Sequence, residues 1–504
     1  MDLLLNGWLF CLLSQFCQYN IKKRKIMKKL LHRLRTILLW RTLHADYPPS
    51  ADALRGLSSF GGRFARIALL TAYCFMFVGT TFAGQVELFS AKNNNQIIQL
   101  TNDFVTAVSF SNNFTESGKL LIFAETFAYS PHFWSEPFEA QFAFELNGTI
   151  VQSSMHYQDV FTNRTGYAAT TISFADVLDI SPGNNSINFQ IKIKQLVDAY
   201  FSKPTMNMIF VPDNGSAVSC HVARLEIATP FTASSDWQDI IFTNLNLDAG
   251  DYLIVGTAAA APVAGDQNAN FYLRAKAASY QLPQAEIDLK DIGDDGMDRS
   301  IVLSRGDQIA NTPVTNFHLQ IRTPYDSVTL YRAALFIIYQ PFNIFQPEIQ
   351  IDSAPGPLTW DWSNSNSNFE KGVVYYSEPK TVLQLSSFTL ITTNNRCLTK
   401  TQLLWNDATV GFPREEELAN GINTPYCYST HLTWVNKVAS GSNIFSTLIG
   451  HGTYDSAPQD SSISSPSRWQ SAVAVTIPEP FYLSFIIYCL LFINRKFIFS
   501  FQKN

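Results

Sequence analysis

The chain has 504 residues, of which 46% are hydrophobic, 15% charged and 13% aromatic. This is the composition of an aromatic-rich globular protein with room for about three domains, and it excludes an intrinsically disordered chain. The net charge of −5 is unevenly distributed: residues 1–84 carry 12 Lys/Arg and 3 Asp, a net charge of +9, so the remainder carries −14. Nucleic-acid binding by this acidic remainder is not expected, because phosphate recognition requires a basic face.

The N-terminal region, residues 1–83, contains two apolar stretches separated by a basic one. The second stretch, 67–79, follows two arginines and ends shortly before the small residue Ala83. A basic segment, an apolar core and a small-residue site are the parts of a secretory signal, so cleavage is predicted between Ala83 and Gly84. The basic sequence further upstream is either an over-extended gene start, with Met27 as the true start, or a second membrane anchor.

The middle of the chain repeats one pattern three times. Residues 116–123 match 248–255, each a polar turn with a glycine followed by a strand, and later strand pairs surround Asn147-Gly148 and Asn406-Asp407. Each unit closes on a similar apolar strand, at 206–211, 333–339 and 472–477. Such self-similarity sets the architecture. We therefore predict an all-β fold of three tandem β-sandwich or jelly-roll-like modules between an N-terminal leader and a C-terminal membrane segment, with module bounds 84–230, 231–345 and 346–477.

The strands of these modules alternate apolar and polar residues. Phe189, Ile191 and Ile193 are separated by Asn188, Gln190 and Lys192. Because side chains in a strand alternate between its two faces, this pattern predicts one face on a core and one in water.

Three cysteines fall between the two ends of the chain. Cys397 and Cys427 lie in one module and are candidates for a disulfide in an oxidising compartment, whereas Cys220 has no local partner. Their spacing matches no zinc site.

An acidic cluster in the second module is a candidate calcium site. Four carboxylates crowd into eight residues around Gly293 and Gly296, and a cation would relieve their mutual repulsion. Their order differs from that of an EF-hand loop. No other cofactor is expected. The cluster comprises Asp291, Asp294, Asp295 and Asp298.

No catalytic signature is found in the chain. The sequence has no Gly-x-Ser-x-Gly, His-Glu-x-x-His or phosphate-loop motif, so we expect a protein that is not an enzyme. Scattered histidines such as His431 and His318 are interpreted as strand or surface residues. Glu415-Glu416-Glu417 is a solvated charge run or, in the alternative, a source of acids for glycoside hydrolysis. Tryptophans such as Trp405 and Trp434 are interpreted as core, or as platforms for sugar rings.

The tripeptide Arg305-Gly306-Asp307 has the sequence of a cell-attachment motif. It is predicted to occupy the turn that leads out of a strand, where Gly and Asp are frequent. Chance is the preferred explanation.

The C-terminal region, residues 478–504, has the features of a sorting signal. The rigid triplet Pro478-Glu479-Pro480 is followed by the apolar run 481–493 and then by Arg495 and Lys496. This order resembles the PEP-CTERM sorting signal of Gram-negative bacteria. The resemblance covers only the tail, and it departs from the family pattern in its short apolar run and in the apolar residues 497–501 that follow the basic pair.

The resemblance implies recognition by an exosortase-like enzyme and transient anchoring in the membrane. The leading hypothesis is an exported structural or adhesion protein of the cell surface or extracellular matrix, linked to biofilm or exopolysaccharide. Extracellular polysaccharide is then an expected partner, besides the membrane. One alternative is a secreted carbohydrate-binding or glycoside-active protein. Another is a single-pass glycoprotein of a eukaryote or virus.

Overall fold

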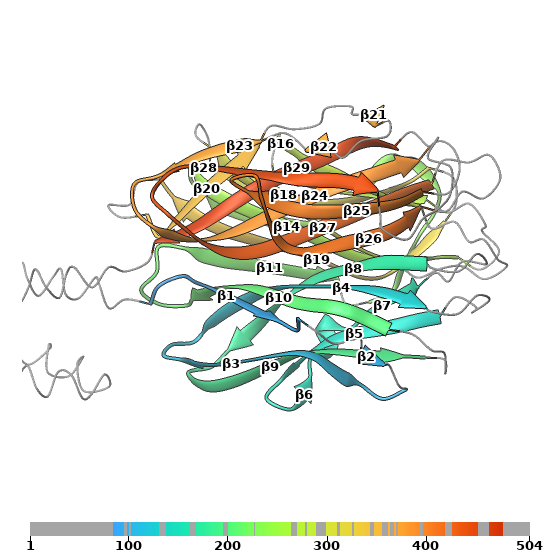
Figure 1. The fold of residues 1–504 in the computed structure, drawn as a ribbon, viewed down its shortest axis with the longest axis horizontal. Helices are drawn as coiled ribbons and strands as arrows, with labels where there is room; N and C mark the ends of the chain where they lie inside the picture. The colour runs from blue at the N-terminus through green and yellow to red at the C-terminus, as the bar shows by residue number, and fades with distance from the viewer. Residues whose placement is uncertain are drawn as a thin grey trace, which may run out of the picture. The chain divides into compact units, whose positions relative to one another are not determined.

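The computed structural model describes residues 84–476 except for segments between strands. The longest of these segments are 131–137, 161–167, 264–269, 289–298, 355–360, 419–425 and 452–462. The predicted leader and the predicted sorting tail lie outside the described residues. Within the described part the protein is almost entirely β-strand, as the sequence predicts, and its strands form six antiparallel sheets (Figure 1).

The first two sheets come from residues 87–212. One sheet has the order β1 (Glu87–Lys92), β10 (Tyr200–Pro212), β4 (Gly118–Ser130) and β8 (Ala168–Ile180), and β2 (Ile98–Gln99) also pairs with β10. Its companion has the order β3 (Val105–Phe114), β9 (Gly183–Ile193), β5 (Phe138–Leu146) and β6 (Thr149–Ile150), and β7 (His156–Val160) also pairs with β5. A short 3-10 helix, η1 (Gln152–Ser154), precedes β7.

The next two sheets come from residues 219–341. One has the order β11 (Ser219–Leu225), β19 (Val328–Pro341), β14 (Gly250–Pro262) and β17 (Arg299–Ile309), with β12 (Thr229–Phe231) on β19. The other has the order β13 (Ser234–Leu247), β18 (Val314–Thr323), β15 (Asn270–Ala277) and β16 (Tyr280–Asp288).

The last two sheets come from residues 349–476. One has the order β20 (Ile349–Ala354), β29 (Ile463–Thr476), β24 (Lys380–Thr392) and β27 (Tyr426–Val438), with β21 (Asp361–Trp362) on β29. The other has the order β22 (Ser367–Asn368), β28 (Gly441–His451), β25 (Cys397–Trp405) and β26 (Ala408–Leu418), with β23 (Gly372–Tyr376) on β28.

The strand order of the three sheet pairs is the same. In each pair the first strand lies beside the last, and the last lies beside a central strand of 13 residues: β4, β14 or β24. This is the connectivity of a jelly roll, in which two four-stranded sheets face each other. The three closing strands predicted from the sequence lie in β10, β19 and β29, which occupy the same place in their sheets.

One strand falls on the unexpected side of a predicted boundary. β11 precedes residue 230, the predicted end of the first module, yet it pairs along its whole length with β19 of the second sheet pair. Ser219 lies opposite Tyr339 and Leu225 opposite Ala333. The second sheet pair therefore begins at Ser219.

The predicted glycine turns have a packing reason. Gly118 and Gly250 open two of the central strands, and a Cβ added there would lie 2.5 Å from the Val211 carbonyl oxygen and 2.2 Å from that of Gln340. Only glycine lets the closing strand come this close.

The sheets that contain β4, β14 and β24 are here called the inner sheets, and their central strands are buried on both faces, whereas the edge strands β1 and β11 are only partly buried. In β14 every residue from Gly250 to Ala261 is buried. Leu253 and Val255 belong to a large apolar cluster that also includes residues of the first and third sheet pairs, whereas Tyr252 and Ile254 face their own companion sheet. The prediction of one face in water is therefore wrong for the inner sheets, because these three sheets cover one another.

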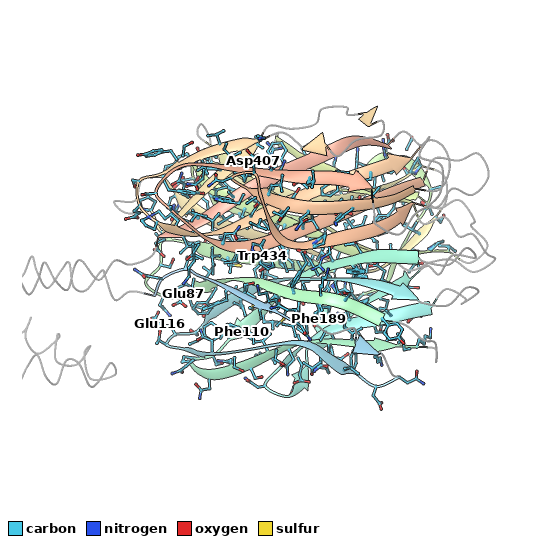
Figure 2. The ribbon with its side chains drawn as sticks, viewed as in Figure 1. Glu87, Phe110, Glu116, Phe189, Asp407 and Trp434 are labelled. Atoms are coloured by element: carbon cyan, nitrogen blue, oxygen red, sulfur yellow. The ribbon has the colours of Figure 1, made fainter. Side chains whose placement is uncertain are left out.

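The companion sheets, here called the outer sheets, follow the predicted alternation in part. In β9, Phe189, Ile191 and Ile193 are buried, and Asn188 and Lys192 are only partly so, but Gln190 is also buried and donates to Glu145 Oε2 at 2.7 Å. Phe189 is fully buried in the core of the first sheet pair (Figure 2). The outer sheets thus supply solvent-facing strands, although β26 packs against the first sheet pair and β16 against the third.

Candidate functional site

The inner sheets meet along β8, β17 and β27, which pack against one another. His431 of β27 lies there. Its ring stacks on Phe123 of β4, with 5.2 Å between centroids and 20° between planes, and its Nε2 lies 2.7 Å from Oγ of Ser304 in β17. This single side chain touches the other two sheet pairs.

The serine–histidine contact has the length of a nucleophile–base pair. Both groups are buried, however: Ser304 is 2% exposed and His431 is 1% exposed. Burial lowers the pKa of His431 to about 3, so the imidazole is neutral at pH 7. A substrate cannot reach Ser304 while the three sheets enclose it, and the contact serves to join the sheets.

The eighth residue of each central strand lies at one of the three contacts between inner sheets. These residues are Glu125 in β4, Thr257 in β14 and Ser387 in β24, and each is buried. Each therefore requires a polar partner or incurs a desolvation cost. The three contacts meet this requirement in different ways.

Between the first and third sheet pairs, Glu125 forms a charged network. Its carboxylate accepts a hydrogen bond from Thr433 Oγ1 and lies 3.6 Å from Arg414 Nη2. Arg414 also donates to the Lys203 carbonyl at 2.9 Å and to Thr205 Oγ1 at 3.0 Å. Burial raises the pKa of Glu125 to about 7 against the opposing effect of Arg414. The Glu125 carboxylate and the Arg414 guanidinium thus form a buried ion pair.

Neutral hydrogen bonds join the second and third sheet pairs. Ser387 Oγ accepts from the Ser304 amide at 2.9 Å, and Ser471 Oγ accepts from the Gly306 amide at 2.7 Å. A Cβ at Gly306 would lie 2.4 Å from Cγ2 of Ile351, so this position has no room for a side chain. Each of these serine side chains in the third sheet pair thus binds the backbone of β17 in the second.

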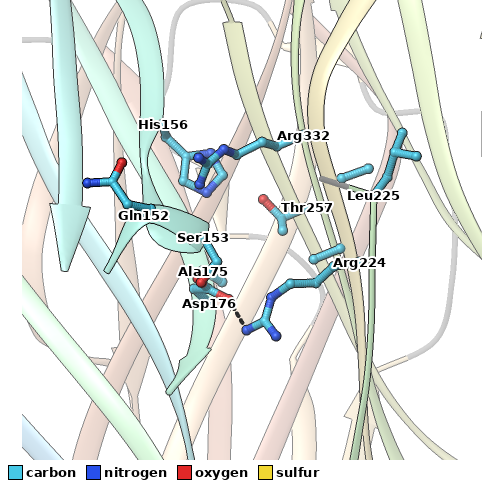
Figure 3. Close-up of a pocket in the computed structure, with 11 residues that line it drawn as sticks. Gln152, Ser153, His156, Ala175, Asp176, Arg224, Leu225, Thr257 and Arg332 are labelled. Atoms are coloured by element: carbon cyan, nitrogen blue, oxygen red, sulfur yellow. Dashed lines mark hydrogen bonds and ion pairs between the residues drawn. The ribbon is translucent and has the colours of Figure 1, made fainter. Parts of the chain in front are cut away.

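A cavity of about 160 Å³ lies between the first and second sheet pairs (Figure 3). Beside it Arg224 Nη2 donates to Asp176 Oδ1 and to the Val177 carbonyl, both at 2.6 Å. Burial raises the pKa of Asp176, and Arg224 opposes this rise. On the other side His156 and Arg332 lie together (Figure 3). Burial and the Arg332 charge lower the pKa of His156 to about 3.

Several polar atoms around this cavity have no hydrogen-bond partner among the described residues. They are His156 Nδ1, Asp176 Oδ2, Arg224 Nε and Thr257 Oγ1. His156 is 3% exposed, and Asp176 and Thr257 are 2% exposed. Buried polar groups in proteins are nearly always hydrogen-bonded to protein or to ordered water, so four such atoms around one cavity mark it as a polar cavity that can hold water or a small solute.

Most of the site residues predicted from the sequence lie outside the described residues. This holds for Ala83 and for the acidic cluster at 291–298, and also for Pro478, Glu479, Pro480, Arg495 and Lys496. Gly84 is described, and a Cβ there would lie 2.5 Å from Glu116 Oε2. Among the residues that the structure describes, no group of three His, Cys, Asp or Glu side chains could hold a metal ion, and no helix is long and apolar enough to cross a membrane.

The predicted disulfide partners are placed only by their backbones. Cys397 begins β25 in an outer sheet, and Cys427 belongs to β27 in the inner sheet of the same pair. Their side chains are outside the described part of the chain, so the disulfide stays a prediction. Cys220 is a free thiol, and burial raises its pKa to about 12.

The tripeptide Arg305-Gly306-Asp307 lies inside β17 and not in a turn. Arg305 pairs with Asp307 at 2.6 Å, and its guanidinium lies 3.4 Å from the ring centroid of Trp469 in the third sheet pair. The predicted turn is wrong, because the strand continues to Ile309. The tripeptide is part of a contact between sheets, which agrees with the interpretation that its spelling arose by chance.

Aromatic residues considered for sugar stacking divide into core and partly exposed positions. Trp405 is 7% exposed and donates to Asn443 Oδ1 at 3.1 Å, so it belongs to the core. Trp434 is partly buried, with Lys92 Nζ 5.1 Å from its ring centroid. The side chains of Trp360 and Trp362 lie outside the described part of the chain. The same holds for Glu415-Glu416-Glu417, the run considered as a source of acids.

Sequence reasoning did not identify the residues around the cavity. Asp176 and Arg224 are far apart in the sequence and belong to different sheet pairs, so no local sequence motif identifies them as a site. One signal was present in the sequence. The run Leu120–Ala124 in β4 is continuously apolar, which indicates a strand buried on both faces and hence a contact between sheets.

Comparisons with known proteins give no family. No family model matches the chain, and no curated protein matches its sequence. Solved structures with some likeness include a T13 particle of infectious bursal disease virus (IBDV), with 7% identity, 79% of each chain covered and a TM-score of 0.20. PNGF-II has 7% identity over 68% of this chain and 98% of its own, with a TM-score of 0.25. A protein with a triple jelly roll fold from an archaeal virus has 11% identity over 78% and 90%, with a TM-score of 0.16. These likenesses are too weak to indicate a function for this chain.

Proposed function

We propose that the chain is a non-enzymatic structural or adhesion protein, exported to the cell surface or extracellular matrix and built from three jelly-roll modules. The recurring strand order supports the module count. Each module contributes one inner sheet to the shared centre, and outer strands such as β13 expose alternate side chains to solvent. Such a body presents three similar surfaces for contacts with extracellular polysaccharide or with other matrix components.

One observation carries the proposal that the protein is structural. The reactive side chains that the fold brings together at the centre are used for joining sheets: His431 with Ser304, and Glu125 with Arg414. All four are buried to 2% exposure or less. An enzyme would need such groups at a surface that substrate can reach.

The resemblance of the C-terminal tail to a PEP-CTERM signal supports export and sorting. In this proposal an exosortase-like enzyme recognises Pro478-Glu479-Pro480, and the apolar run 481–493 holds the protein in the membrane until cleavage. A run shorter than about twenty residues suits a transient anchor.

The test is to express the full-length protein in a Gram-negative host that has an exosortase and to compare it with Glu479→Ala. This substitution leaves the apolar run unchanged and serves as a matched control for membrane insertion. We expect mass spectrometry to show that the wild-type surface fraction lacks 481–493 and sediments with matrix polysaccharide, while the variant stays uncut in the membrane. Retention of 481–493 in released wild-type protein, or equal release of both, would contradict the proposal.

A further inference from the structure

We propose that the first sheet pair binds the new N-terminus of the processed chain: once the bond between Ala83 and Gly84 is cut, the Glu116 carboxylate holds the α-ammonium group of Gly84. This inference rests on the proposed export, because a leader is removed during export. The cut is a hydrolysis, in which water adds a hydroxyl to the Ala83 carbonyl carbon and a proton to the Gly84 nitrogen. The new amine takes up a second proton at neutral pH, since an α-amino group has a pKa of about 7.7–8.0.

Gly84 lies in a corner of the first sheet pair. A Cβ added to it would lie 2.5 Å from Glu116 Oε2, 2.8 Å from Pro212 Cβ and 2.9 Å from the Asn214 carbonyl oxygen. Glu116 belongs to the turn between β3 and β4, and Pro212 ends β10. A side chain at Gly84 would require the backbone at Asn214 to move, so glycine is favoured as the first residue after the predicted cut.

The amino nitrogen of Gly84 lies near the carboxylate. In any residue the nitrogen and Cβ are both bonded to Cα and are about 2.5 Å apart, so the nitrogen of Gly84 is within about 5 Å of Glu116 Oε2. Rotation about the side-chain bonds of Glu116 brings the two groups to ion-pair distance. Glu116 and Glu87, the first residue of β1, lie at the same end of the first sheet pair (Figure 2).

Glu116 has no other cation among the residues that the structure describes. Its side chain is half-buried, yet no hydrogen bond or ion pair joins it to another described residue. Asp179 of the same sheet pair, by contrast, has Lys119 Nζ at 2.7 Å. A partly buried carboxylate loses hydration, and an opposite charge beside it offsets that loss. The ammonium group of Gly84 would supply this charge.

The residues that follow Gly84 keep the terminus in place. Val86 is 2% exposed and belongs to the large apolar cluster, and Glu87 pairs with Phe210 of β10. The terminus therefore has little freedom to lose when it pairs with Glu116, which favours the ion pair. Before the cut the nitrogen of Gly84 is a neutral amide, so the ion pair forms only in the processed protein.

The test is to express the full-length chain, isolate the exported protein and measure the pKa of its α-amine from the rate of acetylation at several pH values. Chymotrypsin then releases residues 84–89, which contain no lysine, so that mass spectrometry reports the α-amine alone. We expect Gly84 as the first residue, with a pKa about half a unit above the usual value, as a partly exposed ion pair gives.

Glu116→Gln is the matched variant, because it keeps the side-chain shape and removes the charge. We expect the pKa of the Gly84 amine to return to its usual value in this variant. Glu87→Gln and Asp213→Asn remove the other carboxylates near the corner and should lower this pKa less. A larger effect of either would overturn the assignment to Glu116.

A blocked cut separates the ion pair from a merely structural role of Glu116. Ala83→Leu retains the leader, because the cleavage site requires a small residue. In processed protein, Glu116→Gln should make hydrogen–deuterium exchange of residues 84–89 about threefold faster, the size expected for one ion pair at a partly exposed site. In the Ala83→Leu background the same substitution should change nothing. An equal change in both backgrounds would overturn the proposal.

The outcomes distinguish this proposal from export itself. Exported protein that begins at Gly84 but has an ordinary amine pKa, or one unchanged in Glu116→Gln, would overturn the ion pair and leave export intact. Exported protein that begins at another residue would do the same. A leader retained on protein that stays in the cytoplasm would contradict export, and the ion pair with it.

Discussion

The contact between the first and third sheet pairs and the contact between the first and second are two versions of one arrangement. In the first version Glu125 is surrounded by Arg414 and Thr433, and its charge is paired inside the interface. In the second version the hydroxyl of the equivalent residue, Thr257, has no hydrogen-bond partner among the described residues, and a cavity lies beside it. Similar backbones can thus close one contact tightly and leave a cavity at another.

The difference comes from side chains, not from strand order. The eighth residue of each central strand is polar and buried in all three inner sheets. The surroundings of this residue differ between the contacts: an arginine and a threonine bind it at one contact, a backbone amide binds it at the second, and a cavity lies beside it at the third.

The largest effect is expected from Arg414→Met. This substitution removes the cation beside Glu125, whose pKa is about 7, and also removes two further hydrogen bonds, so we expect a loss of about 3–5 kcal/mol in the free energy of unfolding at pH 8.5, where Glu125 is ionised in the wild type. Urea unfolding followed by circular dichroism measures it. The double variant Glu125→Gln/Arg414→Met should lose less than the two single losses combined, because no unpaired charge remains. Strict additivity would contradict the paired-charge description.

A smaller effect is expected from acid. His431 has a pKa of about 3 in the folded protein and about 6.5 when unfolded, so the unfolded chain binds more protons between these values. Its contribution to stability is thus present above pH 6.5 and is lost as the pH falls toward 3, by at most about 1.4 kcal/mol per pH unit. His431→Gln should show a flatter loss of stability between pH 6.5 and 4.5 in urea titrations. The same slope in variant and wild type would count against a buried neutral ring.

The smallest effect separates two equivalent serine and threonine positions. Ser387→Ala removes the acceptor of the Ser304 amide and should cost about 1–3 kcal/mol, whereas Thr257→Val removes a hydroxyl with no partner among the described residues and should cost nothing or stabilise slightly. The free energies of unfolding from urea titrations check this. Equal losses at the two positions would show that the contacts do not differ as described.

The sequence predicted the strands well and their assembly poorly. Glycines 118 and 250 and the apolar closing strands marked equivalent places in successive units, because turn chemistry and strand pairing are local. The burial of both faces of β14 was not predicted, since it depends on neighbouring sheets that lie far away in the sequence. For the same reason Asp176, Arg224 and Thr257 gave no motif. Their proximity exists only once the inner sheets have assembled.

Whether the three inner sheets form one cooperative body can be measured by hydrogen–deuterium exchange in increasing urea. Peptides from β4, β14 and β24 are compared by mass spectrometry. Our account predicts that all three central strands lose protection at the same urea concentration, because each is covered by the others. Loss of protection at three separate urea concentrations would show that the sheet pairs unfold independently and would contradict the account.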